Sequence, residues 1–244
     1  MKNQQMKMRT ETEIDGRAEM EYEAKSTGRE KSVRQEGGRE SKTRLLNAAL
    51  HVIRSKGYSA TRVEDICAEA GLTKGGFFHH FKSKEDLALA AADYWSEMTD
   101  EFFRAAAYQR EPDALGRLLG YVDFRKAILL GDLPEFTCLV GTMVQEIYET
   151  HPPIREACER SIFGHAATLE ADIAEAIREH GVTGNWTPRD LALYTQATLQ
   201  GAFVLAKASG SAVVAGECID HLHRYIELLF LGNGQGTASG ELAA

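Results

Sequence analysis

Hydrogen-bond donors and cations are concentrated between residues 61 and 84 of this 244-residue chain. Thr61, Arg62, Thr73, Lys74 and Lys84 stand at or beside expected helix starts, where unpaired N–H groups and the positive end of the helix dipole favour phosphate oxygens. Side chains of this kind can position a protein on a nucleic-acid backbone. The candidate DNA-contacting residues are Lys42, Thr43, Thr61, Arg62, Thr73, Lys74, Gly75, Gly76, Phe78, His79, His80 and Lys84.

The stretch after Thr73 offers the side chains that would reach base edges. Lys74 and His79 have the strongest hydrogen-bonding reach among the residues expected to face outward. Gly75 and Gly76 carry no side chain and so allow a close approach of the backbone. Because long polar groups are few, part of the specificity is expected from DNA shape or from apolar contact with thymine methyl groups.

The elements that must position these residues are three short helical segments joined by tight turns. The first helix is expected to bury an apolar face that begins at Leu45. This helix ends at Gly57, because glycine is a typical residue at helix C-termini. The pattern predicts that Thr61 caps the second helix, with Glu64 completing a capping box, and that this helix ends at Gly71. Thr73 is expected to cap the third. Residues 62–81 therefore have the layout of a helix-turn-helix, and a long helix capped by Ser83 follows.

The charge distribution fits a basic segment on an acidic chain. The formal net charge is −8, but residues 39–84 carry a net +5, which leaves −13 for the remainder. Binding to phosphates requires local Lys and Arg rather than a basic protein. A basic stretch is also typical of an ordinary solvated face, so the charge pattern favours nucleic-acid binding without deciding it.

The remaining pattern predicts an all-α fold. Apolar residues recur at spacings of three and four, and no alternation of period two persists. Breaks near residues 111, 131, 151, 181 and 209 give about nine helices in total: a three-helix DNA-binding head and a larger helical bundle. We expect a head over residues 39–98, a ligand-binding and dimerisation domain over 99–232, and disordered tails over 1–38 and 233–244.

Residues 43 to 95, and above all AGLTKGGFFHHFKSKEDL at 70 to 87, resemble the DNA-binding domain of the TetR/AcrR family of regulators. The pattern of that family is approximately LLxAALxLxxxxGY followed by TxxxDIAxxAGVSKGTLYYHFxSKEDL, which this chain matches without a gap. The resemblance implies a homodimer on a palindromic operator, usually a repressor, with a pocket for a small-molecule effector in the C-terminal part. We also expect no cofactor and no enzymatic activity.

Three positions depart from the family pattern. Phe78 stands where the family usually has a tyrosine that donates to phosphate, and Gly76 replaces a common Thr or Ser. Cys67 replaces the usual Ala, and we interpret it as a small packing residue rather than a redox group. The first two substitutions remove hydrogen-bond donors, so the operator sequence does not follow from the resemblance.

Aromatic and polar residues on apolar helix faces are the candidates for lining an effector pocket, because such pockets combine apolar walls with a few fixed polar groups. For each of them, ordinary core packing is the competing interpretation. The candidates are Tyr121, Phe124, Phe136, Cys138, Met143, Gln145, Phe163, His165, Trp186, Tyr194 and Gln196.

Cys138 supports an alternative, in which the same fold senses oxidants or electrophiles, because the FTCLVG stretch resembles a segment that carries a sensing cysteine in some relatives. A reactive thiol needs access and a lowered pKa, which the sequence does not reveal. The spacing of Cys218, His221 and His223 does not place them well on one helical face, so we predict no metal site and interpret these as surface or interface residues.

The last two long segments are the expected dimer face, because two helices from each subunit would form a four-helix interface around a two-fold axis. Effector binding is expected to move the helix that begins at Ser83 and so to change the spacing of the two recognition helices. The residues expected at the interface are Leu191, Thr195, Thr198, Leu199, Ala202, Leu205, Ile219, Leu222, Ile226 and Leu229.

Other classes of protein find little support. No nucleophile elbow, HExxH sequence or phosphate-cradling glycine loop points to an enzyme. Four scattered cysteines do not form a disulfide framework, which favours a reducing cytoplasm. No apolar run reaches the roughly 18 residues needed to cross a bilayer, and the N-terminus is too charged for a signal peptide.

Overall fold

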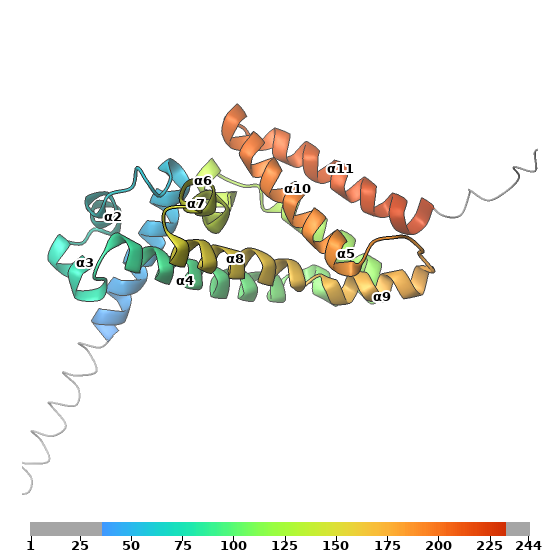
Figure 1. The fold of residues 1–244 in the computed structure, drawn as a ribbon, viewed down its shortest axis with the longest axis horizontal. Coiled ribbons are helices and arrows are strands. Elements are labelled where there is room, and N and C mark those ends of the chain that lie inside the picture. The colour runs from blue at the N-terminus through green and yellow to red at the C-terminus, as the bar shows by residue number, and fades with distance from the viewer. Residues whose placement is uncertain (1–35, 233–244) are drawn as a thin grey trace, which may run out of the picture. The chain divides into compact units, whose positions relative to one another are not determined.

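The computed structural model describes residues 36–232, and all its regular elements in that range are helical (Figure 1). The described residues fall into two units, 36–45 and 46–232. In the first unit, residues 36–45 form the start of a helix that extends to residue 56. The predicted tails lie outside the described residues, except for 36–38, which are helical rather than disordered.

In the second unit, three helices follow the end of that first helix. They are α2 (Val63–Ala70), α3 (Lys74–His80) and α4 (Lys84–Ala105). Gly57 and Gly71 have the positive φ values, 85° and 61°, that the two predicted helix ends require. The predicted caps of α3 and α4 are confirmed, since Thr73 Oγ1 accepts from Gly76 N and Ser83 Oγ accepts from Asp86 N.

The larger part of this unit contains eight further helical segments. They are η1 (Ala107–Arg110), α5 (Ala114–Ala127), α6 (Leu133–Phe136), α7 (Leu139–Ile147), α8 (Pro152–Ala167), α9 (Glu170–His180), α10 (Pro188–Ser209) and α11 (Ala212–Leu231).

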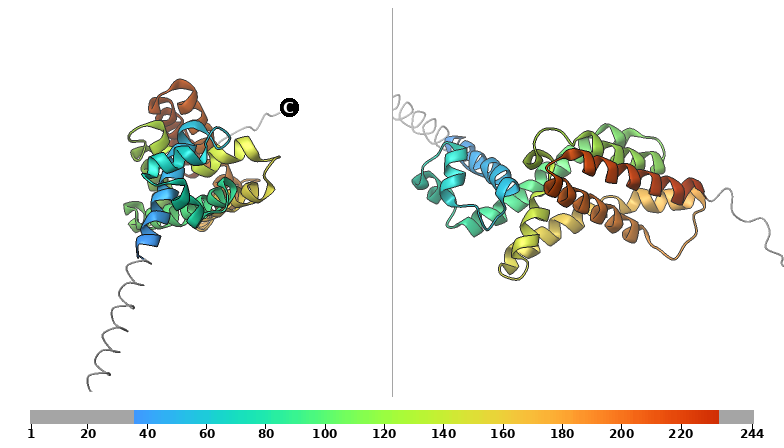
Figure 2. Two further views of the ribbon diagram at one scale, coloured as in Figure 1. Left: turned by 90° about the vertical axis from the view of Figure 1, so that its left-hand side faces the viewer. Right: turned by 90° about the horizontal axis from the view of Figure 1, so that it is seen from above.

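These helices pack against one another as a bundle. Helices α10 and α11 run side by side, and α11 also packs against α5, as the view from above shows (Figure 2). Helix α8 packs against α4 and α7. The main core lies among α5, α9, α10 and α11, with fully buried side chains such as Leu118, Ile173, Leu199 and Ile226. Burying these apolar surfaces is the main term that stabilises the bundle.

The all-α prediction is confirmed, but the chain is divided more finely than the sequence pattern indicates. Helix α6 is separated from α7 at Thr137 and Cys138, and α8 is separated from α9 at Thr168 and Leu169. The second break contains neither Gly nor Pro. The hydroxyl of Thr168 donates to the carbonyl oxygen of His165 at 2.7 Å, and the side chain of Leu169 is buried in the core. Such a side-chain bond to the backbone competes with continued helix.

Candidate DNA-binding surface and internal pocket

A tight turn sets α3 against α2. The amide of Leu72 donates to the carbonyl oxygen of Cys67 at 2.9 Å, and Gly71 adopts the left-handed conformation between them. The small side chain of Cys67 is buried, and burial raises the pKa of its thiol, as expected for a packing residue. Phe77 and Phe81 are buried beneath α3, so the opposite face of α3 remains outward.

The outward face of α3 carries most of the predicted base-reading set. Thr73, Lys74, Gly75 and His79 are exposed, and the ring of Phe78 is 57% exposed. Lys74 forms an ion pair with Glu64 of α2, and this pairing raises the pKa of the Lys74 ammonium. An exposed large aromatic ring beside a cation and two small residues is a surface able to contact another molecule.

Nothing inside the described chain requires glycine at residue 75. A Cβ atom added there would lie 3.7 Å from Thr73 Oγ1, an ordinary van der Waals contact, and the backbone does not adopt positive φ. The same distance separates an added Cβ at Gly76 from that oxygen. Because glycine is costly in a helix, its presence here fits a need for close approach by another molecule.

Two predicted phosphate-contacting residues are placed differently from the expectation. Thr61 is only 1% exposed, and its hydroxyl donates to the carbonyl oxygen of Gly57 at 2.6 Å. The ammonium of Lys84 donates to the carbonyl oxygens of Tyr58 and Thr61, both at 3.0 Å, and lies 4.2 Å from the ring centroid of Tyr58. These two side chains therefore form hydrogen bonds that stabilise the turn before α2, instead of contacting a phosphate.

The predicted cap of α2 is also corrected. The N-cap residue is Arg62 rather than Thr61, and Asp65 Oδ2 accepts from Arg62 N at 2.8 Å. Asp65 takes the place expected for Glu64 because the helix starts one residue later. Arg62 therefore stands exposed at the start of α2.

The other predicted contacts vary in exposure. Lys42 and Thr43 are exposed in the residue 36–45 segment. His80 is half-buried, and its ring lies 4.8 Å from that of His79. The exposed Lys82, between α3 and α4, is a further cation that the sequence prediction omitted, although its position just before a capped helix start was a usable signal.

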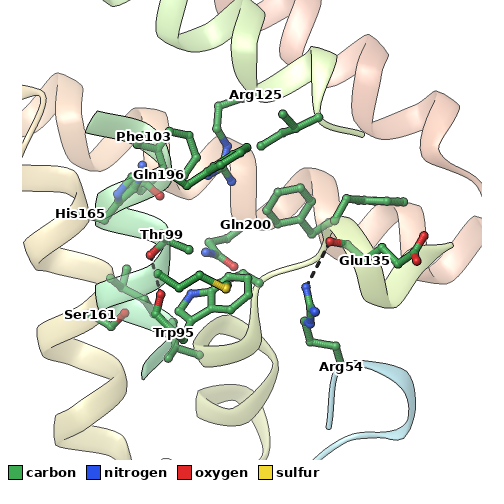
Figure 3. A pocket seen from close by; sticks show the side chains of 18 of the residues that line it. Arg54, Trp95, Thr99, Phe103, Arg125, Glu135, Ser161, His165, Gln196 and Gln200 are labelled. Atoms are coloured by element: carbon green, nitrogen blue, oxygen red, sulfur yellow. Dashed lines mark hydrogen bonds between the residues drawn. The ribbon is translucent and has the colours of Figure 1, made fainter. Parts of the chain in front are cut away.

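A pocket of about 350 Å³ lies beside α4 (Figure 3). We call it the Arg125 pocket. Its walls combine aromatic and aliphatic side chains with a small number of polar groups, as is typical of small-molecule sites. The lining residues are Arg54, Trp95, Met98, Thr99, Phe102, Phe103, Arg125, Ile128, Leu129, Glu135, Phe136, Cys138, Val140, Ser161, Ile162, His165, Gln196, Gln200 and Phe203.

A buried polar network borders this pocket. Gln196 Nε2 donates to Tyr121 Oη at 2.9 Å, and Tyr121 Oη lies 3.0 Å from His165 Nε2. Burial lowers the pKa of His165 to about 3, with the nearby Arg125 charge adding to the effect, so the imidazole is neutral at neutral pH. Burial also raises the pKa of Tyr121. These groups act as fixed neutral donors and acceptors.

The structure brings some of the predicted ligand-site residues together and separates others. Phe136, Cys138, His165 and Gln196 line the Arg125 pocket, whereas Gln145 lines a separate, smaller hollow near Lys207.

The remaining candidates lie elsewhere. Tyr121 and Phe124 stand behind the pocket wall in the aromatic cluster around Phe103. Met143 is fully buried, and Phe163 is exposed. The last two candidates, Trp186 and Tyr194, lie outside the pocket. The ring of Trp186 contacts that of Phe230, and the ring of Tyr194 contacts that of Tyr225.

Two arginines of the pocket were missed by the sequence prediction. Arg125 follows Leu118, Tyr121 and Val122 at helical spacing, so it stands on the buried face of α5. A cation within an apolar stripe was the signal that could have identified it. Arg54 comes from the first helix, and its guanidinium lies 5.0 Å from the ring centroid of Trp95.

Polar contacts join the first helix and the turn after it to the α6–α7 region. Arg54 Nη1 donates to the carbonyl oxygens of Glu135 and Thr137 at 3.2 and 3.3 Å, as Figure 3 shows for Glu135. The carboxylate of Glu146, on α7, accepts from the amides of Tyr58 and Ser59 at 3.2 and 2.8 Å. The helix-turn-helix and the pocket are thus connected through fixed hydrogen bonds.

The expected dimer face needs a correction at the level of residues. Seven of its ten predicted residues are buried within the chain itself: Leu191, Thr195, Leu199, Ala202, Ile219, Leu222 and Ile226. Of the ten predicted residues, Leu205 is the one that is also among the large apolar side chains that α10 and α11 leave exposed. The large exposed apolar residues of these helices are Tyr194, Val204, Leu205, Val213, Tyr225, Leu228 and Leu231.

In the part of the chain that the structure describes, no helix is long and apolar enough to span a membrane. No group of three His, Cys, Asp or Glu side chains within residues 36–232 is arranged to hold a metal ion.

Comparison with known proteins connects both parts of the chain to one family. Residues 45–91 match the family described as bacterial regulatory proteins, tetR family, and residues 123–214 match the C-terminal domain of LmrA/YxaF-like transcriptional regulators. A crystal structure of a TetR transcriptional regulator from Chloroflexus aurantiacus is similar, with a TM-score of 0.69 and 29% identity, over 78% of this chain and 96% of that one.

Two curated relatives match shorter stretches of the chain. The uncharacterized HTH-type transcriptional regulator YerO of Bacillus subtilis is 40% identical over 60 residues, which cover 25% of this chain and 21% of YerO. The HTH-type transcriptional regulator CymR of Pseudomonas putida is 31% identical over 125 residues, which cover 50% of this chain and 58% of CymR. Each of these two matches spans less than two thirds of the relative. The two matched domains, the relatives and the shared fold together place this chain in the TetR family of DNA-binding transcriptional regulators.

Proposed function

We propose that this protein binds a palindromic operator as a homodimer, most simply as a repressor, and is released when a small molecule occupies the Arg125 pocket. One observation carries the proposal: the pocket is lined both by α4, which follows α3 directly, and by Arg54 of the first helix. A molecule in the pocket would contact the elements that position the recognition helix. The predicted boundary between the DNA-binding head and the C-terminal domain, at residue 98, passes through this pocket, because Trp95 and Phe102 both line it.

The connection supports a defined mechanism. Displacing Arg54 or the side chains of α4 would disturb the hydrogen bonds to Glu135 and Thr137 and shift the turn held by Glu146. A ligand produces release only if it binds the form unable to hold DNA more tightly than the competent form. We infer that residues 39–98 provide the DNA-binding head and that residues 99–232 provide dimerisation and most of the effector pocket, to which Arg54, Trp95 and Met98 of the head also contribute. The protein would act in the cytoplasm, where the DNA lies.

The exposed apolar face of α10 and α11 supports the dimer. Leu228 is 68% exposed, and Val213 and Leu231 on the same helix are also exposed. Large apolar side chains left exposed on two neighbouring helices favour an interaction surface there. A two-fold pairing of this face would place two recognition helices on one side of a duplex, as a palindromic operator requires.

Recovery of DNA bound by the full chain, followed by footprinting, would test the proposal. We expect a two-fold symmetric protected site. Lys74→Ala should weaken binding to that site and reduce its salt dependence, because one cation is removed from the exposed face of α3. Glu64→Gln is the matched control, since it frees Lys74 from its ion pair and should preserve or strengthen binding. A chain indifferent to every duplex at low salt would contradict the proposal.

A second candidate function rests on the surroundings of Cys138. Its sulfur accepts from Gly141 N at 3.3 Å at the start of α7. Cys138 is partly exposed and lines the Arg125 pocket, so a reagent that enters the pocket would lie beside its sulfur. In this case Cys138→Ser should abolish release from the operator by an oxidant or electrophile and leave DNA binding unchanged, whereas a preserved response would eliminate this candidate.

A further inference from the structure

We propose that the Arg125 pocket recognises an apolar molecule that carries a carboxylate, and that the carboxylate pairs with the guanidinium of Arg125. This inference rests on the proposed function, in which the same pocket receives the effector, and it adds the chemical class of that effector.

Arg125 has no polar partner among the residues that the structure describes. Its Nε is buried and has no hydrogen-bond partner among residues 36–232, and no carboxylate in that range forms a salt bridge with it. Its guanidinium instead lies near two rings, 5.2 Å from the centroid of Phe103 and 5.4 Å from that of Phe203. Leaving a buried donor unsatisfied is costly, so a partner that supplies acceptor oxygens is favoured here.

The second arginine of the pocket shows that this lack of partners is specific. Arg54 also lies against an aromatic ring, that of Trp95, but its Nε donates to Leu50 O and its Nη1 donates to two further carbonyl oxygens. Nε and Nη1 of Arg54 are therefore already bonded to backbone carbonyl oxygens. Arg125 retains the free donors of a planar fork, the geometry that accepts a carboxylate through two parallel hydrogen bonds.

The charge around the pocket also favours an anion. Glu135 is the one acidic residue that lines it, and the carboxylate of Glu135 is engaged with the amide of Asp132 at 2.8 Å. His165 faces the same space as a neutral imidazole, because burial and the Arg125 charge lower its pKa to about 3. Two arginines against one carboxylate leave the pocket with an excess of positive charge, which an anionic ligand would neutralise.

The other lining residues favour a ligand whose remaining part, beyond the carboxylate, is apolar. Trp95, Met98, Phe102 and Phe136 contribute aromatic and thioether surface, and the volume of about 350 Å³ is at the small end of the range for drug-sized ligands. Figure 3 shows Arg125 at one side of the pocket, with Trp95 and Thr99 across from it. An aromatic or branched aliphatic acid of modest size would place its ring against these walls and its carboxylate at Arg125.

Binding of naphthoate and of its neutral counterpart naphthamide to the full chain tests the inference by calorimetry without DNA. Wild-type protein should bind naphthoate, and Arg125→Gln should weaken that binding by about 10- to 100-fold, the range for a lost charge-assisted hydrogen bond. The variant should not weaken naphthamide binding comparably. Lys126→Gln is the matched control: it removes the next cation along α5, which pairs with Asp220 on the surface, and should leave naphthoate affinity unchanged.

Several results would overturn the inference. They are equal binding of naphthoate and naphthamide by the wild type, unchanged naphthoate affinity in Arg125→Gln, or no binding of naphthoate, decanoate or biphenyl carboxylate at millimolar concentration. Should Arg125→Gln not fold, Arg125→Lys is the second variant. It keeps the charge but loses the planar fork, so weaker naphthoate binding is still expected.

The failure of this inference is distinguishable from failure of the proposed function. A neutral compound that fills the pocket and releases the operator would overturn the carboxylate assignment and leave the regulator intact. Carboxylate binding that depends on Arg125 but never alters operator affinity would support the assignment and contradict the proposed release mechanism.

Discussion

Replacing Gly75 with alanine separates the stability of the recognition helix from its fit to DNA. Within the protein the added methyl group meets only Thr73 Oγ1, at 3.7 Å, and the backbone is already helical. Glycine in a helix is less stable than alanine by up to about 1 kcal/mol. Since Gly75 lies in the first turn of α3, we expect a gain of roughly 0.5–1 kcal/mol in the free energy of unfolding, or about 1–4 °C in Tm.

The same methyl group should weaken DNA binding, because it projects from the exposed side of α3 next to Lys74. We expect at least about a tenfold loss in operator affinity, equivalent to about 1.4 kcal/mol. Thermal unfolding measures the first effect, and fluorescence anisotropy with a labelled operator measures the second. Gly164→Ala is the matched control, since Gly164 is exposed on α8 with no atom within 4 Å of an added Cβ, so it should keep full affinity.

Two results would refute this reasoning. If Gly75→Ala lowered Tm, then the space around residue 75 would be smaller than the structure indicates. If the variant bound the operator as tightly as wild type, then the glycine face of α3 would not be the surface that approaches DNA.

Three further predictions concern pH dependence, coupling and assembly. His165 has a lower pKa when folded than when unfolded, so the unfolded state binds more protons and stability should fall as pH drops from about 6.5 toward about 3, by at most about 1.4 kcal/mol per pH unit. In His165→Gln, denaturation at pH 7 and pH 5 should reveal a smaller loss; an unchanged slope argues against a buried neutral imidazole. Glu146→Gln weakens the acceptor for the amide of Ser59, so effector binding should change operator affinity by a smaller factor in anisotropy titrations, and an identical factor would exclude this contact from the coupling. Leu228→Glu should convert a dimer to monomers, which light scattering would measure. The control is Leu130→Glu, at a residue 72% exposed outside α10 and α11, which should leave the dimer intact. Dimers that survive Leu228→Glu would place the interface elsewhere.

Local chemistry allowed the helix-turn-helix to be predicted in detail. Thr73 and Ser83 cap helices as expected, and Gly71 adopts positive φ, because these preferences depend on a few neighbouring residues. The cap of α2 was misplaced by one residue because Thr61 and Arg62 both precede acidic residues at suitable spacing. The burial of Thr61 under the turn decided between them.

The internal pocket was only partly predictable. His165 and Gln196 were identified as polar residues on apolar faces, and both line it. Arg54 and Arg125 were not, because a charged residue is usually expected to face solvent. Their position follows from the packing of the first helix, α4, α5 and α10 around one space, which no single segment of sequence encodes.

The sequence by itself determined the helical class, the recognition helix and its outward residues, since these depend on periodicity and on caps within a few residues. Only the tertiary structure decided which apolar side chains of α10 and α11 are buried in the core. Leu199 and Ile226 are buried within the chain, whereas Leu205 and Leu228 stay exposed. Periodicity marks an apolar face, but the orientation of that face depends on the neighbouring helices against which it packs.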